Sequence, residues 1–227
     1  MFKVLVADDH PVVREGLKQM VARAHDMVVV AEASDGPEVL EKHRRTHPDV
    51  ILLDISMPGR NGLEVLKQLR AKSPHMPILV LSQHPEGEYA IRALRAGASG
   101  YLTKVSASGE LITALRKVVN GGKYVSASLA EQLADEVNHD SEKPPHQALS
   151  DREYEVLCLL GAGTTVTEIA EKLSLSVKTV STYRTRILEK MNMTKTAELV
   201  RYAVQHQLLI EPEPPTPPHS LKPRASA

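Results

Sequence analysis

The stretch that decides the fold reads VILLDISMPG and spans residues 50–59. Four apolar residues in a row lead into Asp54, so this segment has no polar face to turn toward water. A continuous apolar run of this length is typical of a strand covered on both faces, as in parallel sheets. The stretch therefore predicts a buried strand with a carboxylate at its carboxyl end.

Four more apolar runs lie in the first half of the chain, at Val4–Ala7, Met27–Ala31, Ile78–Leu81 and Gly100–Leu102. Amphipathic stretches separate them, at Pro11–Ala24, Gly36–Thr46, Gly62–Lys72, Glu86–Ala96 and Ser108–Asn120. Buried strands alternating with helices predict an α/β fold in which helices cover both faces of a parallel sheet. We expect a five-stranded, doubly wound sheet.

The second half of the chain changes character three times. Residues 121–148 begin with two glycines, contain a short amphipathic segment and end near two prolines, which indicates an interdomain linker with a short helix. Residues 149–210 predict an all-α domain of four helices. Residues 211–227 hold six prolines and predict a disordered tail. The expected domains are therefore 1–120 and 149–210.

Bulk composition excludes several classes of protein. Lys plus Arg equals Asp plus Glu at 28 each, so net charge points to no partner. The single cysteine, Cys158, rules out an intramolecular disulfide and a cysteine-rich zinc site. No run approaches the ~18 apolar residues of a membrane span. We expect a soluble, cytoplasmic protein without a membrane partner.

Charged and hydroxyl side chains follow four of the predicted strands. Asp8 and Asp9 follow the first, Asp54 the third, Ser82 ends the fourth and Lys104 follows the fifth. Sites in open parallel sheets form at the carboxyl ends of the strands, so we expect these groups to converge. Clustered carboxylates suit Mg²⁺, and a carboxylate beside that ion can become an aspartyl phosphate. A lone Asp at a strand end is often only a cap, but five such groups together are not explained by capping.

Residues 1–120 resemble the receiver domain of bacterial two-component response regulators, which has a CheY-like, flavodoxin-like fold. The motifs that carry the resemblance are Asp8-Asp9-His10, Leu53 to Gly59, Leu81-Ser82 and Gly100 to Lys104. The resemblance implies a phospho-acceptor at Asp54 and Mg²⁺ ligands at Asp8, Asp9, Asp54 and the backbone carbonyl of Ser56. It also implies a phosphoryl-binding and switch set at Ser82, Lys104 and Tyr101, with Tyr101 turning inward on phosphorylation. Many receivers have proline after the lysine, and here Val105 stands there.

The all-α region contains two short helices joined at Ser174 to Ser176, the length of a helix-turn-helix joint. Ser150 to Glu153 and Thr165 to Glu168 each match a capping box. Between Ser176 and Lys195 there are five basic residues and one acidic residue, so the second helix is locally basic. A basic helix alone is equally well explained as a solvated surface.

The stretch from Leu149 to Ser181 resembles the LuxR-type helix-turn-helix, and its pairing with a receiver resembles the NarL/FixJ class of regulators. The resemblance covers about residues 1–210. It implies that a recognition helix, Val177–Lys190, contacts DNA through Lys178, Thr179, Ser181, Thr182, Arg184, Thr185, Arg186 and Lys190. It further implies a sensor histidine kinase as phosphodonor, double-stranded promoter DNA, RNA polymerase as a possible contact and a homodimer when active.

Other functions fit less well. An aspartyl-phosphate phosphohydrolase needs a second carboxylate at position 56, where this chain has Ser56. A nucleotide hydrolase needs a phosphate-cradling Gly-rich loop ending in Lys-Ser or Lys-Thr, which the sequence lacks. A constitutive DNA-binding regulator with a vestigial receiver remains open, since only the intact acidic set argues against it. We expect a phosphorylation-controlled transcriptional regulator and not an enzyme.

Overall fold

The computed structural model describes residues 1–57, 61–84, 86–138 and 144–208. The receiver-like half contains five strands: β1 (Phe2–Ala7), β2 (Met27–Ala33), β3 (Val50–Asp54), β4 (Ile78–Ser82) and β5 (Gly100–Thr103). Its helices are α1 (Pro11–Ala22), α2 (Gly36–Thr46), α3 (Gly62–Lys72), α4 (Glu88–Arg95) and α5 (Ala107–Val119). The strands are all parallel and lie in the order β2-β1-β3-β4-β5, which confirms the predicted doubly wound sheet.

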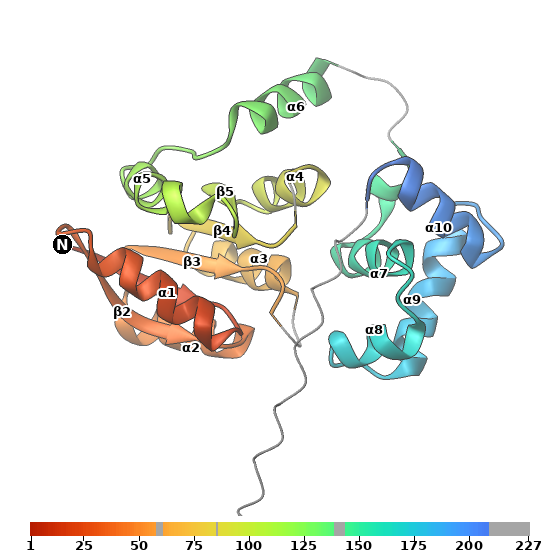
Figure 1. Ribbon diagram of the computed structural model, residues 1–227, viewed down its shortest axis with the longest axis horizontal. Helices are drawn as coiled ribbons and strands as arrows, with labels where there is room; N and C mark the ends of the chain where they lie inside the picture. Colours follow the sequence, from red (N-terminus) through yellow and green to blue (C-terminus); the bar gives the residue numbers. More distant parts are fainter. Residues whose placement is uncertain (58–60, 85, 139–143, 209–227) are drawn as a thin grey trace, which may run out of the picture.

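The sheet is buried because helices cover both of its faces (Figure 1). One layer of core side chains joins the sheet to α1 and α5 and includes Leu17 and Leu111. The other joins it to α2, α3 and α4 and includes Val39 and Leu66. All five residues of β3 are buried, as the apolar run predicts, and Asp54 is therefore carried into the interior at the end of that strand.

The region between the two domains is more structured than a plain linker. Tyr124 pairs with Gly100 beside β5, and helix α6 (Ala127–Asn138) packs on α4 through the fully buried Leu129. A 3₁₀ turn, η1 (Pro145–Ala148), precedes the C-terminal helices and buries His146. The predicted disordered tail, residues 211–227, lies outside the described residues.

The C-terminal domain consists of α7 (Asp151–Gly161), α8 (Val166–Lys172), α9 (Val177–Lys190) and α10 (Thr196–Gln205). Both predicted capping boxes are present: Ser150 and Glu153 at α7, and Thr165 and Glu168 at α8. Helix α7 packs against α8, α9 and α10, and the apolar core of this domain continues into the α4 side of the receiver-like core. Among the described residues, no helix combines the length and apolar character needed to cross a membrane.

The start of α3 needs a glycine beside the strand that carries Asp54. A Cβ on Gly62 would stand 2.3 Å from the Ile55 Cα. We predict that Gly62→Ala lowers the free energy of unfolding by about 2 kcal/mol through overpacking. Gly16→Ala is the matched control because a Cβ there meets nothing within 4 Å, and alanine inside a helix should stabilise by about 1 kcal/mol. Urea unfolding checks both, and equal stability of the two variants would contradict the packing argument.

Candidate functional site

Two carboxylates are buried side by side at the carboxyl edge of the sheet. Ala7 pairs in register with Leu53, so Asp8 and Asp54 follow neighbouring positions of β1 and β3. Both are fully buried. The Lys104 Nζ lies 2.7 Å from Asp8 Oδ2 and 2.7 Å from Asp54 Oδ2, and it therefore bridges the two. These three residues therefore converge, as the sequence predicts.

Protonation of this cluster follows from burial and from the lysine. Burial raises the pKa of Asp54 to about 6, because Lys104 offsets the loss of hydration only in part and the charge of Asp8 adds to the rise. Burial opposes the charge of Lys104, but the two carboxylates outweigh it and raise the pKa of the ammonium. When both are ionised, the carboxylates of Asp8 and Asp54 therefore carry more negative charge than the single ammonium of Lys104 neutralises.

The donor atoms fit a divalent cation. Asp8, Asp9, His10 and Asp54 each offer a ligand atom within 4.8 Å of the others. Carboxylate oxygens are the ligands that Mg²⁺ prefers, whereas an imidazole is less suited to it. The His10 Nδ1 instead lies 3.0 Å from Asp9 Oδ1, a distance at which a protonated ring forms an ion pair with the carboxylate. Sequence reasoning placed His10 in the Asp8-Asp9-His10 motif at this pocket but did not count it among the metal ligands.

The predicted switch residues lie on β4 and β5. Ser82 is fully buried, and its hydroxyl oxygen accepts a hydrogen bond from the His84 backbone N–H at 3.0 Å. The Tyr101 ring is also fully buried, and its hydroxyl donates to the His84 carbonyl at 2.9 Å. The inward turn of Tyr101 expected on phosphorylation therefore does not start from this conformation, because the ring is already inside. Both residues hold the same segment after β4.

The residues of α9 expected to contact DNA differ in their exposure to solvent. Val180 and Ile187 are buried, while Lys178, Thr182, Thr185 and Arg186 are exposed. The Thr182 hydroxyl donates to the Lys178 carbonyl and that of Thr185 to the Ser181 carbonyl, as commonly happens inside helices. Lys190 differs from the expectation, since its Nζ lies 2.6 Å from Glu153 Oε2 on α7. It is engaged inside the domain in this structure.

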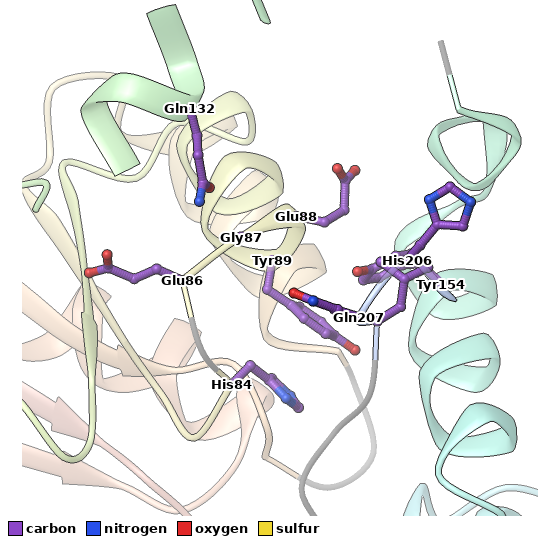
Figure 2. Close-up of a pocket in the computed structure, with 10 residues that line it drawn as sticks. His84, Glu86, Gly87, Glu88, Tyr89, Gln132, Tyr154, His206 and Gln207 are labelled. Atoms are coloured by element: carbon purple, nitrogen blue, oxygen red, sulfur yellow. The ribbon is translucent and has the colours of Figure 1, made fainter. Parts of the chain in front are cut away.

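Sequence reasoning missed the contacts between the two domains. Tyr89 on α4 stacks on His84 with ring centroids 4.0 Å apart and meets the edge of Tyr154 on α7 at 4.9 Å (Figure 2). Beside them, a pocket of about 230 Å³ lies between α4, α6, α7 and the end of α10. Its acidic side chains are already paired, Glu86 with Ser126 and Glu88 with Arg92. No spacing pattern in the sequence marks such contacts.

Two family descriptions match the chain. Residues 4–116 match the "response regulator receiver domain", and residues 147–203 match the "bacterial regulatory proteins, luxR family". Over 213 residues the chain is 39% identical to the response regulator GacA of Pseudomonas aeruginosa, covering 92% of this chain and 98% of that one. Over 209 residues it is 35% identical to the response regulator UvrY of Escherichia coli, covering 92% and 96%.

Solved structures agree with this arrangement. RcsB of Salmonella enterica serovar Typhimurium, bound to the rprA promoter with the phosphomimetic BeF₃⁻, shares 27% identity and superposes with a TM-score of 0.63. That match covers 88% of this chain and 97% of the RcsB chain. The two family matches and the relatives covered along nearly their whole length favour a transcriptional regulator over the enzyme alternatives. The chain belongs to the two-component response regulators of the NarL/FixJ class, phosphorylation-regulated DNA-binding proteins in which a receiver precedes a LuxR-type helix-turn-helix.

Proposed function

We propose that Asp54 is the phospho-acceptor and that a sensor histidine kinase supplies the phosphoryl group. The observation that carries this is the bridge from Lys104 to Asp54 and Asp8, at 2.7 Å on each side. A carboxylate oxygen of Asp54 attacks phosphorus, the bond from phosphorus to the donor histidine breaks and the imidazole leaves. Lys104 then neutralises part of the charge on the phosphoryl oxygens.

The acidic cluster of this receiver is of the kind that binds Mg²⁺, and we propose Asp8, Asp9, Asp54 and the Ser56 carbonyl as its ligands. When bound, such an ion would supply electrostatic stabilisation of the transferring oxygens. The Asp54 pKa of about 6 supports the proposal, because a buried carboxylate beside Asp8 lacks sufficient positive charge without a cation. The Ser82 hydroxyl, now bonded to the His84 N–H, is the group expected to turn toward the phosphoryl group.

We further propose that α9 enters the major groove of promoter DNA as part of a homodimer in the cytoplasm. Lys178 and Arg186 are exposed and are expected at phosphates, while the exposed Thr182 and Thr185 and the half-buried Ser181 are expected at base edges. Thr179 and Arg184 are expected at phosphates, and Lys190 must first leave Glu153 to join them. Contact with RNA polymerase at the promoter is part of the same proposal. The assignment of α9 as the recognition helix rests on the resemblance to the LuxR-type helix-turn-helix, and the proposed domain bounds remain 1–120 and 149–210.

Phosphorylation tests the acceptor. With Mg²⁺ and acetyl phosphate, the wild-type chain should give a shifted band in a phosphate-affinity gel. Asp54→Ala should give none, because the attacking oxygen is gone. Asp49→Ala, which removes a carboxylate at the opposite end of β3, should leave the shift intact. A shifted band that persists in Asp54→Ala would place the acceptor elsewhere.

The free energy of unfolding tests whether a cation binds at Asp54. Since the folded pKa of Asp54 lies above its unfolded value, ionisation costs folding free energy as pH rises from about 4 to 6, and the cost stays constant above 6. Without metal, Asp54→Asn should therefore stabilise the chain by about 1–3 kcal/mol at pH 7.5 and by almost nothing below pH 4.

Saturating Mg²⁺ should narrow the stability difference between wild type and Asp54→Asn. It should stabilise the wild type by about 1–2 kcal/mol through linkage and leave Asp54→Asn nearly unchanged. Urea unfolding with EDTA or MgCl₂ measures both effects. Asp26→Asn is the control, since its exposed carboxylate pairs with Arg116 and should show neither the gain nor the Mg²⁺ response. Equal Mg²⁺ stabilisation of wild type and Asp54→Asn would exclude Asp54 as a ligand.

DNA binding tests the sorting of contacts on α9. Lys178→Ala should weaken binding to specific and nonspecific duplexes alike and reduce the slope of log affinity against log salt by about 1. Thr185→Ala should change preference at particular base pairs and keep the slope. Fluorescence anisotropy across salt concentrations, on a site selected from random duplexes, separates the two. The assignment is wrong if Lys178→Ala changes preference without weakening binding.

A further inference from the structure

The DNA-binding domain forms one wall of a pocket at the mouth of the phosphorylation site. The pocket has a volume of about 150 Å³. Asp9, Ser56 and His84 line it from the receiver, and Glu155, Leu159 and Lys172 line it from α7 and α8. The charge of Lys172 also contributes, after burial, to lowering the pKa of His84 to about 4, which agrees with their closeness.

The receiver residues of this pocket are the rim around Asp54. Asp9, Ser56 and His84 lie in the segments that follow β1, β3 and β4, the three strands whose ends surround the acceptor. Asp54 itself is fully buried below them. A phosphodonor that approaches along the carboxyl edge of the sheet therefore meets α7 and α8 before it meets the acceptor.

Arg92 on α4 is the main polar anchor of this arrangement. Its guanidinium donates to the Leu149 carbonyl at 2.9 Å and to the His146 carbonyl at 2.8 Å. It also lies 4.3 Å from the centre of the Tyr154 ring. Arg92 is 9% exposed, so these hydrogen bonds are shielded from water. Charge-assisted bonds of this kind are about twice as strong as neutral ones.

Contacts from α3 and the segment before it complete the interface. The Asn61 side-chain N–H₂ donates to Glu155 Oε2 at 2.9 Å, and Lys67 Nζ lies 2.5 Å from Asp151 Oδ2. The Tyr89 ring fills the space between His84 and Tyr154 (Figure 2). Anchors on α3 and α4 thus hold α7 at one edge of the receiver.

The outer face of the recognition helix is not the covered surface. Lys178, Thr182 and Thr185 on α9 are exposed, and the interdomain contacts come from η1, α7 and α8. In Figure 1, α7 lies on the receiver side of its domain. The interface therefore restricts access to Asp54 rather than access to α9.

The pocket discriminates by size between two classes of phosphodonor. A helix with its side chains is about 10 Å across, so the surface that carries a kinase phosphohistidine does not fit into a space of about 150 Å³. A free acyl phosphate is a small anion that does fit, and Lys172, which lines the pocket, carries a charge that attracts it.

We infer that the helix-turn-helix domain is a steric lid on the acceptor, which admits small acyl phosphates and excludes protein phosphohistidine until the domains separate. This inference rests on the proposed acceptor role of Asp54. With acetyl phosphate, the Asp54 oxygen bonds to phosphorus, the bond from phosphorus to the acyl oxygen breaks and acetate leaves. With a kinase, the bond from phosphorus to the histidine nitrogen breaks and the imidazole leaves. The chemistry at Asp54 is the same, and only access differs.

The test compares both donors on the full chain. The protein donor is a phosphorylated histidine kinase domain chosen because it phosphorylates the Arg92→Ala chain. Arg92→Ala should raise the transfer rate from this domain by about tenfold over wild type, the effect of losing one charge-assisted hydrogen bond of the lid. The initial rate with acetyl phosphate should change little. Arg45→Ala, which removes an exposed arginine on α2, should match wild type with both donors.

A second variant distinguishes loss of the interdomain contact from misfolding of the Arg92→Ala chain. Lys67→Glu reverses an exposed charge opposite Asp151 and should show the same donor-specific gain. Equal kinase transfer to wild type and both variants would overturn the lid, and so would an equal gain with both donors. Failure of acetyl phosphate to modify any of the chains would instead overturn the acceptor role of Asp54.

Thiol labelling measures how accessible the rim around Asp54 is, and it needs no kinase. Ser56→Cys places a thiol on the rim, and Cys158 does not compete because burial raises its pKa to about 12. N-methylmaleimide should label the introduced thiol at similar rates with and without Arg92→Ala. A maleimide carrying a long polyethylene glycol chain should react about tenfold faster when Arg92→Ala is present, by the same interaction loss. Equal rates with the bulky reagent would show that α7 and α8 do not cover the rim.

Discussion

The structure is organised around two buried carboxylates that one lysine holds together. Asp8 and Asp54 are fully buried, and the Lys104 Nζ stands between them. Burying a carboxylate costs several kcal/mol unless an opposite charge is close, so the sheet must bring the end of β5 to the ends of β1 and β3. The parallel order β2-β1-β3-β4-β5 does this, because every strand delivers its carboxyl end to the same edge. The residual imbalance, seen in the Asp54 pKa of about 6, makes the site receptive to a cation and to a charge-changing modification.

Much of this arrangement could be predicted because it depends on local patterns. The apolar run of β3 has no polar face, which leaves only a strand covered on both sides. Asp54 and Lys104 could be placed together because strand ends in a parallel sheet share an edge. The capping boxes at Ser150 and Thr165 marked the starts of α7 and α8, because in each box the glutamate three residues later accepts a hydrogen bond from the backbone N–H of the capping residue. The strand and the caps are each set by a few neighbouring residues, and the meeting of Asp54 with Lys104 follows from the shared edge of the parallel strands.

Other features depend on contacts that no local pattern encodes. Arg92 reads as an exposed arginine on an amphipathic helix, but its guanidinium is buried against carbonyls more than 50 residues away. Lys190 reads as a phosphate contact at the end of a basic helix, yet Glu153 on α7 holds it. Tyr101 was expected outside before phosphorylation, because the sequence does not reveal that the His84 carbonyl accepts its hydroxyl inside. Long-range partners decide all three.

Helix α7 shows why such an interface can be both specific and reversible. Nine of its residues are buried, because the helix packs on its own domain and on the receiver at once. It packs on α9 and α10 in its own domain and buries apolar side chains such as Val156 and Leu157, whose exposure would cost the hydrophobic free energy of a core. Toward the receiver, it combines apolar contacts that include the Tyr89 ring with the polar side chains of Arg92, Lys67 and Asn61. Water can replace polar partners, so separating the domains costs far less than unfolding either one. A balance of a few kcal/mol is what the phosphorylation proposed for Asp54 could shift through the segment that Ser82 and Tyr101 hold.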